Sequence, residues 1–586
     1  MTSLLPLLVI SVPWAGALAV ITIGDQRPAW QHRLAVLVAV VTAGLAWGLA
    51  GQLSSEPALE VALGGVFGTA SLVIDGLGLL LTLVATNIGA LAVVFSVSYM
   101  ADSPQLGRYY ALVLVFIGAM VGLVLSGGLV LLFIFWELTA LCSYALIAFE
   151  NDRPEAVAGG IRALIMTQLG GLGLMFSALL LAGSLGSDQI GVALTEGGEL
   201  APGVLALAGY GMIFAAAAKS AQVPFHTWLP GAMEAPTPIS ALIHAATMVN
   251  AGVYLLARFA PLFAEVPGWS TTVMTVGVVT ALLAALLACT ANDLKAALAY
   301  STVSQLGYMV YAIGVGAVFA SLFHLLSHAI FKALLFLAAG AVIHSVHTRD
   351  MGQMGGLGKR MPFVQAAFAL GALALAGLPM MNGYWSKDLI LDAGRTDGPL
   401  WSYALMLLGA GLTGFYSLRM MARVFWGPPS KAAAHAHEAA PPMQMALGTL
   451  GAASVVSWLL AEPLSEVLHA TLPAHHVHVE ALPELIPHVL QGSLIVLPVV
   501  AVGLLVWLGR GYLAGMTPYL GWLAAATRAE FGFTWLNQQV VGAARSGQRG
   551  MQALHLGQLN WNLAGLVLGL SGLLLALLYV VLRMGA

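Results

Sequence analysis

Three ionisable side chains are spaced at four-residue steps within one apolar stretch. His324, His328 and Lys332 lie in AVFASLFHLLSHAIFKALLFLAAGAVI, which is long enough to cross a bilayer. Residues four apart on a helix lie one turn above another, so the side chains would form a stripe about 12 Å long. Imidazole exchanges protons near neutral pH, and charge at membrane depth normally has a function. The stripe therefore predicts proton transfer inside a membrane.

Further ionisable residues lie in other apolar stretches. Glu137 is central in LVLLFIFWELTALCSYALIAF, His244 lies in ALIHAATMVNAGVYLLARF, and Lys219 and Lys387 adjoin interrupted stretches. A buried carboxylate seeks a cation, and a Glu137–Lys219 pair would switch between ionised and neutral states because burial disfavours both charges. A static ion pair is the alternative, and each histidine alone fits a packed interior residue. The predicted proton pathway comprises Glu137, Lys219, His244, His324, His328, Lys332 and Lys387.

The histidine pair also has the spacing of metal or haem ligands. It lacks an acidic residue on its stripe, and Lys332, one turn further on, would repel a cation. Cys142 and Cys289 are isolated in apolar stretches and can form neither a disulfide framework nor an iron–sulfur site. We therefore predict no metal, no cofactor and no catalytic residue in this chain.

These side chains need membrane helices to hold them. The chain has 586 residues, of which 60% are hydrophobic and 8% charged, a composition that excludes a soluble globular domain and a nucleic-acid-binding surface. We predict an all-α polytopic membrane protein with about sixteen transmembrane helices. They lie near residues 4–23, 34–51, 77–100, 109–126, 128–149, 162–183, 203–221, 239–259, 271–290, 296–315, 318–343, 363–381, 400–426, 443–461, 489–509 and 561–583.

Charge differs between alternate connections. Those starting with the first hold most cations, such as Arg27, Arg108 and Arg349, whereas the others hold acids such as Glu56 and Glu196. Because cytoplasmic loops collect Lys and Arg, both termini are predicted on the outer side of the cell (inner) membrane.

Two apolar stretches are interrupted near a lysine. The first breaks between Lys219 and Pro238, and the second breaks at Gly377 and Pro379, shortly before Lys387. Each break is the fourth member of a five-helix unit, and an odd-numbered repeat inverts in the membrane; simple proline kinks are the alternative. The predicted parts are 1–108 (helices 1–3), 109–259 and 271–426 (two inverted repeats), 443–509 (helices 14–15), 510–560 (a lateral segment) and 561–586 (the last helix).

The lateral segment mixes polar and aromatic residues. Arg528, Gln539 and Arg545 alternate with Trp522 and Trp535. This pattern suits an amphipathic helix lying along the bilayer or along partner subunits, and a plain cytoplasmic loop is the alternative.

Five passages carry a family resemblance: FWELTALCSYALIAF, KSAQVPFHTWLPGAMEAPTPISALIHAATMVNAGVYLLARF, NDLKAALAYSTVSQLGYM, FHLLSHAIFKALLFLAAGAVIHSVHTRDMGQMGGLGKRMP and NGYWSKD. Over about residues 70–430 the chain resembles the antiporter-like subunits of respiratory complex I (L-type, NADH dehydrogenase chain 5) and of Mrp multisubunit cation/proton antiporters (large A subunit). The resemblance implies two inverted five-helix repeats, the pair Glu137–Lys219, a central relay at Lys332, intervening histidines, and Lys387 in the second half-channel.

This likeness implies a proton-translocating membrane subunit of a multisubunit complex, with sodium exchange in the Mrp branch. The alternative is a structural anchor with an inactive channel in an oxidoreductase, hydrogenase or bicarbonate-accumulating complex. Two positions depart from the L-type pattern, since Gln168 and Gly171 stand where that subunit usually has an arginine and an aspartate. Asn250 similarly replaces a lysine that is frequent in the Mrp large subunit. The expected partners are other membrane subunits, contacted through residues 510–560, together with lipid, protons and, in the Mrp branch, Na⁺.

Overall fold

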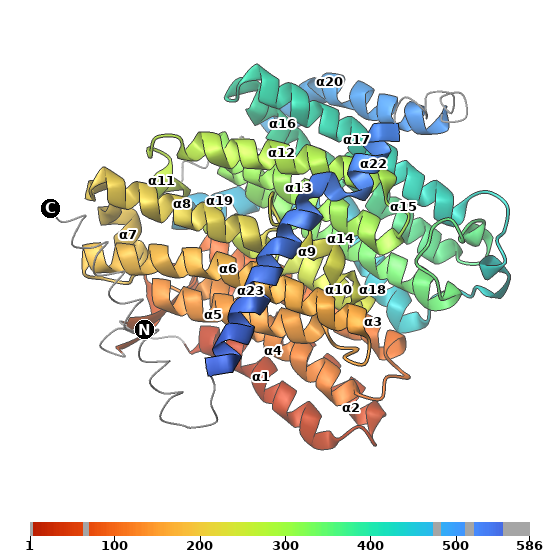
Figure 1. Cartoon of the computed structure of the whole chain (residues 1–586), viewed down its shortest axis with the longest axis horizontal. Coiled ribbons are helices and arrows are strands. Elements are labelled where there is room, and N and C mark those ends of the chain that lie inside the picture. Colours follow the sequence, from red (N-terminus) through yellow and green to blue (C-terminus); the bar gives the residue numbers. More distant parts are fainter. Residues whose placement is uncertain (1–3, 63–68, 473–481, 510–520, 555–586) are drawn as a thin grey trace.

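The computed structural model describes residues 4–62, 69–472, 482–509 and 521–554. Most of this part is helical, and long helices run side by side in one bundle (Figure 1). The predicted helical, polytopic class is confirmed. One addition is a small antiparallel pair of strands, β1 (Pro57–Ala62) and β2 (Thr69–Val73), in the connection between the second and third predicted spans.

The longer helices correspond closely to the predicted stretches. Twelve described helical segments are long and apolar enough to span a membrane. The figure of about sixteen stays a prediction, because residues 561–583 lie outside the described part. The helices are α1 (Leu5–Ile23), α2 (Pro28–Gly48), α3 (Gly76–Tyr99), α4 (Leu106–Leu125), α5 (Leu129–Ile147), α6 (Pro154–Leu185), α8 (Pro202–Lys219), α11 (Asn250–Phe263), α12 (Trp269–Thr290), α13 (Leu294–Gly314), α14 (Val318–Val346), α15 (Pro362–Ala376), α16 (Asn382–Thr396), α17 (Leu400–Phe425), α18 (Pro441–Val456), α19 (Ala461–Thr471) and α20 (Leu482–Leu508).

The remaining helices complete the described part. They are η1 (Leu49–Gln52), α7 (Ile190–Glu196), η3 (Gly197–Glu199), α9 (Trp228–Gly231), η4 (Ala232–Glu234), α10 (Thr237–Ala241), η5 (Leu242–Ala246), η6 (Leu357–Lys359), η7 (Ala432–His435), η8 (Ser457–Leu460), α22 (Gly521–Arg528), η10 (Glu530–Gly532) and α23 (Phe533–Leu554).

Local sequence explains where several helices begin and how closely they pack. The Asp75 and Asp293 carboxylates cap α3 and α13 by accepting from backbone N–H groups of the first turn. Glycines let α12 and α13 approach closely, since a Cβ on Gly277 would lie 2.4 Å from the Tyr311 nitrogen and one on Gly307 2.7 Å from that of Ala281. Helix α13 also packs against α14.

Both predicted breaks are present. Helix α8 ends at Lys219, and the chain continues through α9, η4, α10 and the π-helical η5 into α11. Helix α15 ends at Ala376 and is followed by Gly377, whose φ of +78° favours glycine, and α16 starts at Asn382. Each break therefore has a buried lysine beside it, Lys219 at the first and Lys387 at the second.

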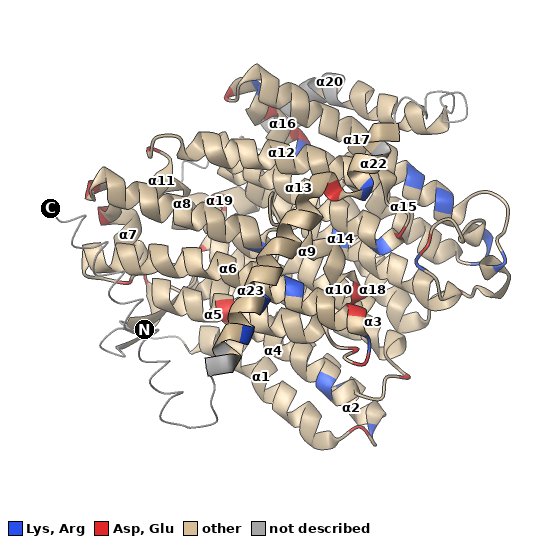
Figure 2. Cartoon of the chain, in the orientation of Figure 1, with Lys and Arg blue, Asp and Glu red and all other residues tan. Residues whose placement is uncertain are grey.

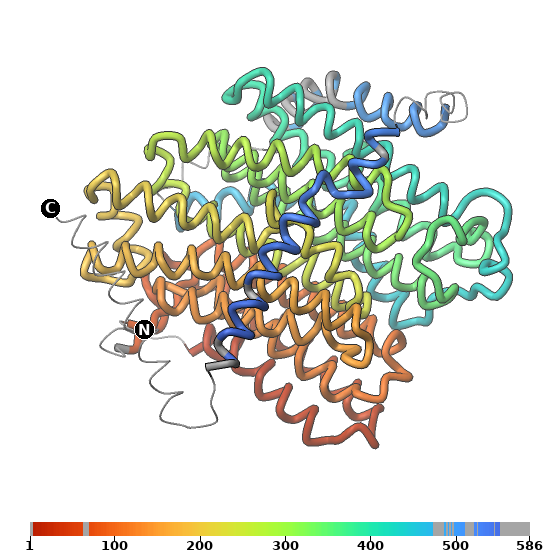
Figure 3. The backbone as a smooth tube through the Cα atoms, viewed as in Figure 1, coloured from red at the N-terminus to blue at the C-terminus, as the bar shows by residue number. Residues whose placement is uncertain are grey.

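The lateral segment is helical in its described part but not continuous. Helices α22 and α23 are separated by η10, where Phe531 has a left-handed backbone (φ +52°). In Figures 1 and 3, α23 crosses obliquely in front of α6 and α9. Its Asn537 amide donates to the Pro224 carbonyl, 3.2 Å away, and to the Thr227 hydroxyl, so it docks on the first break.

Charged residues divide between the ends of the bundle. Figure 2 shows many Lys and Arg at the end near α2 and α15, and few near α7. We call the former the basic end. It carries the α1–α2, α3–α4 and α5–α6 connections, in keeping with the alternation seen in the sequence.

Candidate functional site

The predicted pathway residues lie inside the bundle. Glu137 is half-buried, and the others are at most 1% exposed. They come from α5 (Glu137), α8 (Lys219), η5 (His244), α14 (His324, His328, Lys332) and α16 (Lys387).

Lys219 is held by α5, although not by the carboxylate we predicted. Its Nζ donates to the Trp136 carbonyl oxygen at 2.8 Å and to Thr139 Oγ1 at 2.9 Å, and it lies 4.8 Å from the centre of the Trp136 ring. Among the described ion pairs none joins Lys219 to Glu137. The structure thus puts the ammonium beside the residues flanking Glu137, without a direct ion pair.

The Glu137 carboxyl points toward α6. A Cβ added to Gly171 would lie 2.0 Å from Glu137 Oε1, so any larger residue there would displace the carboxyl. Oε1 has no protein hydrogen-bond partner, and Gln168 lies beside the same carboxyl. The two departures noted in the sequence, Gln168 and Gly171, therefore both surround Glu137.

His244 occupies the π-helical turn η5, between the first break and α14. Its ring centre lies 6.3 Å from that of Trp228 in α9 and 5.9 Å from that of Phe336, one turn after Lys332. Neither ring nitrogen has a protein partner. Because π-helical turns recur at functional sites, this irregular turn is consistent with the predicted place of His244 in the proton pathway.

Lys332 faces α13. Its Nζ donates to the Ser301 hydroxyl and lies 3.3 Å from the Leu298 carbonyl oxygen. One turn earlier, the His328 ring packs edge-on against Phe331, 5.5 Å between centres, with both nitrogens unpartnered by protein groups. The stripe on α14 is therefore directed into the α13–α14 interface.

His324 connects the stripe to the second break. Its Nδ1 lies 2.9 Å from Ser386 Oγ on α16, and its Nε2 lies 3.1 Å from Gln305 Oε1 on α13. The next residue after Ser386 is Lys387, whose Nζ donates to the Leu375 carbonyl oxygen at 2.6 Å. The structure thus brings His324 and the α16 break together.

Several buried polar atoms lack protein partners in the described part. They include Ser240 Oγ, Ser327 Oγ and both ring nitrogens of His244 and His328. Buried polar groups normally find partners, and a polar site with several such atoms suits ordered water.

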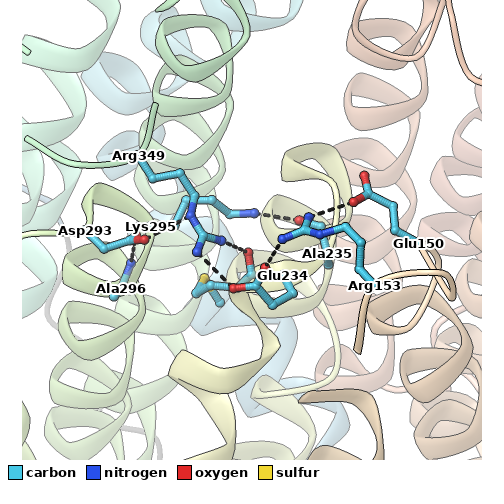
Figure 4. A network of polar contacts seen from close by, with 9 residues as sticks. Glu150, Arg153, Glu234, Ala235, Asp293, Lys295, Ala296 and Arg349 are labelled. Atoms are coloured by element: carbon cyan, nitrogen blue, oxygen red, sulfur yellow. Dashed lines mark hydrogen bonds and ion pairs between the residues drawn. The ribbon is translucent and has the colours of Figure 1, made fainter. Parts of the chain in front are cut away.

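One buried lysine is not among the predicted pathway residues. Lys295, in the first turn of α13, is 3% exposed, and its Nζ donates to the Ala235 carbonyl oxygen at 2.6 Å (Figure 4). A usable signal was present, because Lys295, Leu298 and Ser301 follow at three-residue steps toward the Lys332 site.

Glu234 lies next to this lysine and joins two arginines (Figure 4). Its carboxylate accepts from Arg153 at 2.8 Å and from Arg349 at 2.9 Å, and Arg349 also pairs with Asp293 at 2.9 Å. Burial acts to raise the pKa of the Glu234 carboxyl, but the Arg349 hydrogen bond and the charges of both arginines outweigh it and lower the pKa below its ordinary value. The network ties the α5–α6, α12–α13 and α14–α15 connections to the first break.

A metal site is not among the features of the described part, which holds no group of three or more His, Cys, Asp or Glu suited to a metal ion. The predicted pathway residues supply amines, imidazoles and the Glu137 carboxyl, which are groups able to exchange protons.

Comparisons with known proteins agree with this architecture. Residues 126–413 match the family described as NADH:quinone oxidoreductase/Mrp antiporter, TM, and residues 62–110 match NADH-ubiquinone oxidoreductase (complex I), chain 5 N-terminus. The matched range contains every predicted pathway residue.

Relatives cover the chain to different extents. NADH-quinone oxidoreductase subunit L of Mycobacterium tuberculosis is 37% identical over 554 residues, 91% of this chain and 87% of that one. NAD(P)H-quinone oxidoreductase chain 5 of Synechocystis sp. is 42% identical over 408 residues, 66% of this chain but 59% of the relative. A chain of the Mrp complex from Dietzia sp. DQ12-45-1b superposes with a TM-score of 0.79 at 28% identity, covering 98% of this chain and 63% of that one. The chain therefore belongs to the NADH:quinone oxidoreductase/Mrp antiporter family of membrane subunits.

Proposed function

We propose that this chain translocates protons as a membrane subunit of a multisubunit complex, along Glu137, Lys219, His244, Lys332, His328, His324 and Lys387. The observation that carries the proposal is the buried row of amines and imidazoles between the two helix breaks, several of whose nitrogens have no protein partner. Buried charge of this kind is expensive in a membrane and is normally retained for ion movement.

The residues would act in two halves. In the first, Lys219 exchanges a proton near Glu137, and a change in either charge alters the other through a short, poorly screened distance. In the second, His328 and His324 pass the proton between Lys332 and Lys387, with imidazole accepting on one nitrogen and donating from the other. Water bridges the spaces that no side chain fills.

Both breaks support a pair of inverted five-helix units, residues 109–259 and 271–426. In each, a buried lysine donates to a backbone carbonyl oxygen, Lys219 to Trp136 and Lys387 to Leu375. Such interrupted helices at the middle of a bundle are a usual feature of inverted-repeat transporters.

The relatives favour an assembly rather than a solitary carrier, since those named above are subunits of a quinone oxidoreductase and of an Mrp complex. We propose that other membrane subunits contact residues 510–560. We also propose that the basic end faces the cytoplasm and that both termini lie outside the cell. Exchange of Na⁺ for protons is a second proposed activity. The competing function is a structural anchor with an inactive channel.

Proton translocation by the assembled complex in sealed vesicles separates the two. The variants Lys219→Ala, Lys332→Ala and Lys387→Ala should each lower the initial rate at least tenfold, with assembly verified by copurification of the partner subunits. Lys431→Ala, an exposed lysine of the η7 helix region, should not. Wild-type rates in all three buried variants would establish the anchor instead.

A further inference from the structure

A cavity opens at the basic end of the bundle, outside the buried row of charges. Its volume is about 1010 Å³, far more than the roughly 30 Å³ that one water occupies in the liquid. Its walls are the C-terminal turns of α3 and α14, the α3–α4 and α5–α6 connections, and Pro236 ahead of α10. Chain segments that are distant in sequence thus surround one opening.

The lining suits cations and water. Asp102 and Asp152 line it and take part in no described ion pair, whereas the lining cations Arg153 and Arg349 are both bound by Glu234. Glu150 also lines the cavity and pairs with Arg153, so three lining acids face two lining arginines. The charge of the lining is therefore negative even at this basic end, and it raises the local concentration of hydronium and other small cations.

A hydroxyl pair lies at the inner wall. Tyr99, at the end of α3, lines the cavity, and its Oη lies 3.1 Å from Thr237 Oγ1 on α10. Thr237 is 1% exposed, so it lies just behind the cavity wall. The Tyr99–Thr237 contact therefore separates open solvent from the bundle interior.

Polar atoms continue inward from this contact. Ser240 follows Thr237 by three residues and His244 follows Ser240 by four, on successive turns of α10 and η5. Both are fully buried, and Ser240 Oγ and the two His244 nitrogens have no protein partner. Atoms of this kind, lying behind a water-accessible wall, are suited to a file of water.

We propose that this cavity is the intake of the proton pathway, that hydronium enters it from the basic end, and that the Tyr99–Thr237 hydroxyl pair is the threshold to Ser240 and His244. The proposal rests on the proposed function and adds the place where protons enter. Each step is a proton hop between oxygens or to an imidazole nitrogen, so no other reactant is required.

Water access is tested without measuring transport. In the assembled complex carrying Cys142→Ala and Cys289→Ala, Ser240→Cys should react from the basic end with the small cationic reagent methanethiosulfonate ethylammonium. Ala241→Cys, the equally buried next residue, should react at least tenfold more slowly. Equal rates at the two positions would overturn the intake.

Transport tests the threshold and the opening. Thr237→Val, which removes the hydroxyl and keeps the shape, should slow proton translocation about tenfold, and Thr237→Ser should restore it. A bulky maleimide on Ser103→Cys, in the cavity wall, should block translocation, whereas the same label on Gln26→Cys, exposed at the same end, should not. If Thr237→Val and labelled Ser103→Cys are fully active while the Lys219, Lys332 and Lys387 variants are inactive, the intake is wrong and the proposed function still stands. If those three lysine variants are active, the proposed function is wrong.

Discussion

The Lys219 ammonium is bonded to the carbonyl oxygen of Trp136, 2.8 Å away, and not to the carboxylate of the residue that follows. A carbonyl dipole stabilises the ammonium without neutralising it, so the net charge of the lysine remains available to respond to Glu137. The pair is therefore arranged as two neighbouring charges, which suits repeated protonation better than a locked ion pair.

The Thr139 hydroxyl provides the second acceptor for Lys219, at 2.9 Å. Thr139→Val keeps the shape and removes that acceptor, at a cost of about 1.4 kcal/mol to the charged lysine. If the charged form is used in transport, the translocation rate should fall about tenfold. Thr139→Ser keeps an oxygen and should stay near the wild-type rate. A Val variant as active as the Ser variant would show that this bond is not used.

Gly171 provides the space for the Glu137 carboxyl. In Gly171→Ala, the new Cβ would meet Oε1 at 2.0 Å, so the carboxyl must move away from α6. We expect translocation to fall severalfold while the complex still assembles. Gly183→Ala is a matched control on the same helix, because nothing lies within 4 Å of its added Cβ. Equal rates in the two variants would mean that the position of the carboxyl does not matter.

Ser386 orients His324 beside the second break. Ser386→Ala removes the contact with Nδ1 and leaves the ring held by Gln305 alone, so we expect the translocation rate to fall about tenfold. Ser454→Ala is the control: Ser454 is equally buried on α18 and bonds only the Leu450 carbonyl of its own helix. The idea fails if both variants transport alike.

Acid should weaken the Glu234 network. The pKa of the Glu234 carboxyl lies below its ordinary value of 4.5, so the stability it contributes is present above pH 4.5 and is lost as the pH falls through the lowered pKa. Glu234→Gln should lower the free energy of unfolding by roughly 1 kcal/mol at pH 7 and should not change it at a pH below the lowered pKa. Thermal unfolding of the assembled complex should therefore give wild-type and variant curves that converge on acidification.

A control fixes the interpretation of those curves. Glu60 is exposed in β1 and belongs to none of the described ion pairs, so Glu60→Gln should change the unfolding temperature much less than Glu234→Gln does at pH 7. Parallel curves for Glu234→Gln would contradict the network's assigned charge.

The sequence predicted the helices, the breaks and three buried lysines, Lys219, Lys332 and Lys387, because each has a composition signal. Apolar length identifies a span, Pro and Gly mark an interruption, and Lys332 is conspicuous among leucine and alanine. The four-residue stripe correctly placed His324, His328 and Lys332 on one helix, α14.

Other features carry no such signal. A backbone carbonyl can accept from any nearby lysine, whatever its residue type. The sequence therefore could not predict that Lys219 donates to Trp136 or that Lys295 donates to Ala235. Helices that are apolar on every side also lack the periodicity that shows which face meets which neighbour. The kink at Phe531 lies in a non-glycine residue with positive φ, which residue preferences disfavour.

The central claim is that water joins the buried amines and imidazoles into one line, and a density map of the assembled complex in lipid, sharp enough to show ordered water, measures this directly. The account predicts water within hydrogen-bonding distance of Ser240 Oγ, Ser327 Oγ and the ring nitrogens of His244 and His328, all unpartnered by protein here. A map in which tightly packed hydrocarbon surrounds these atoms in every state would contradict it.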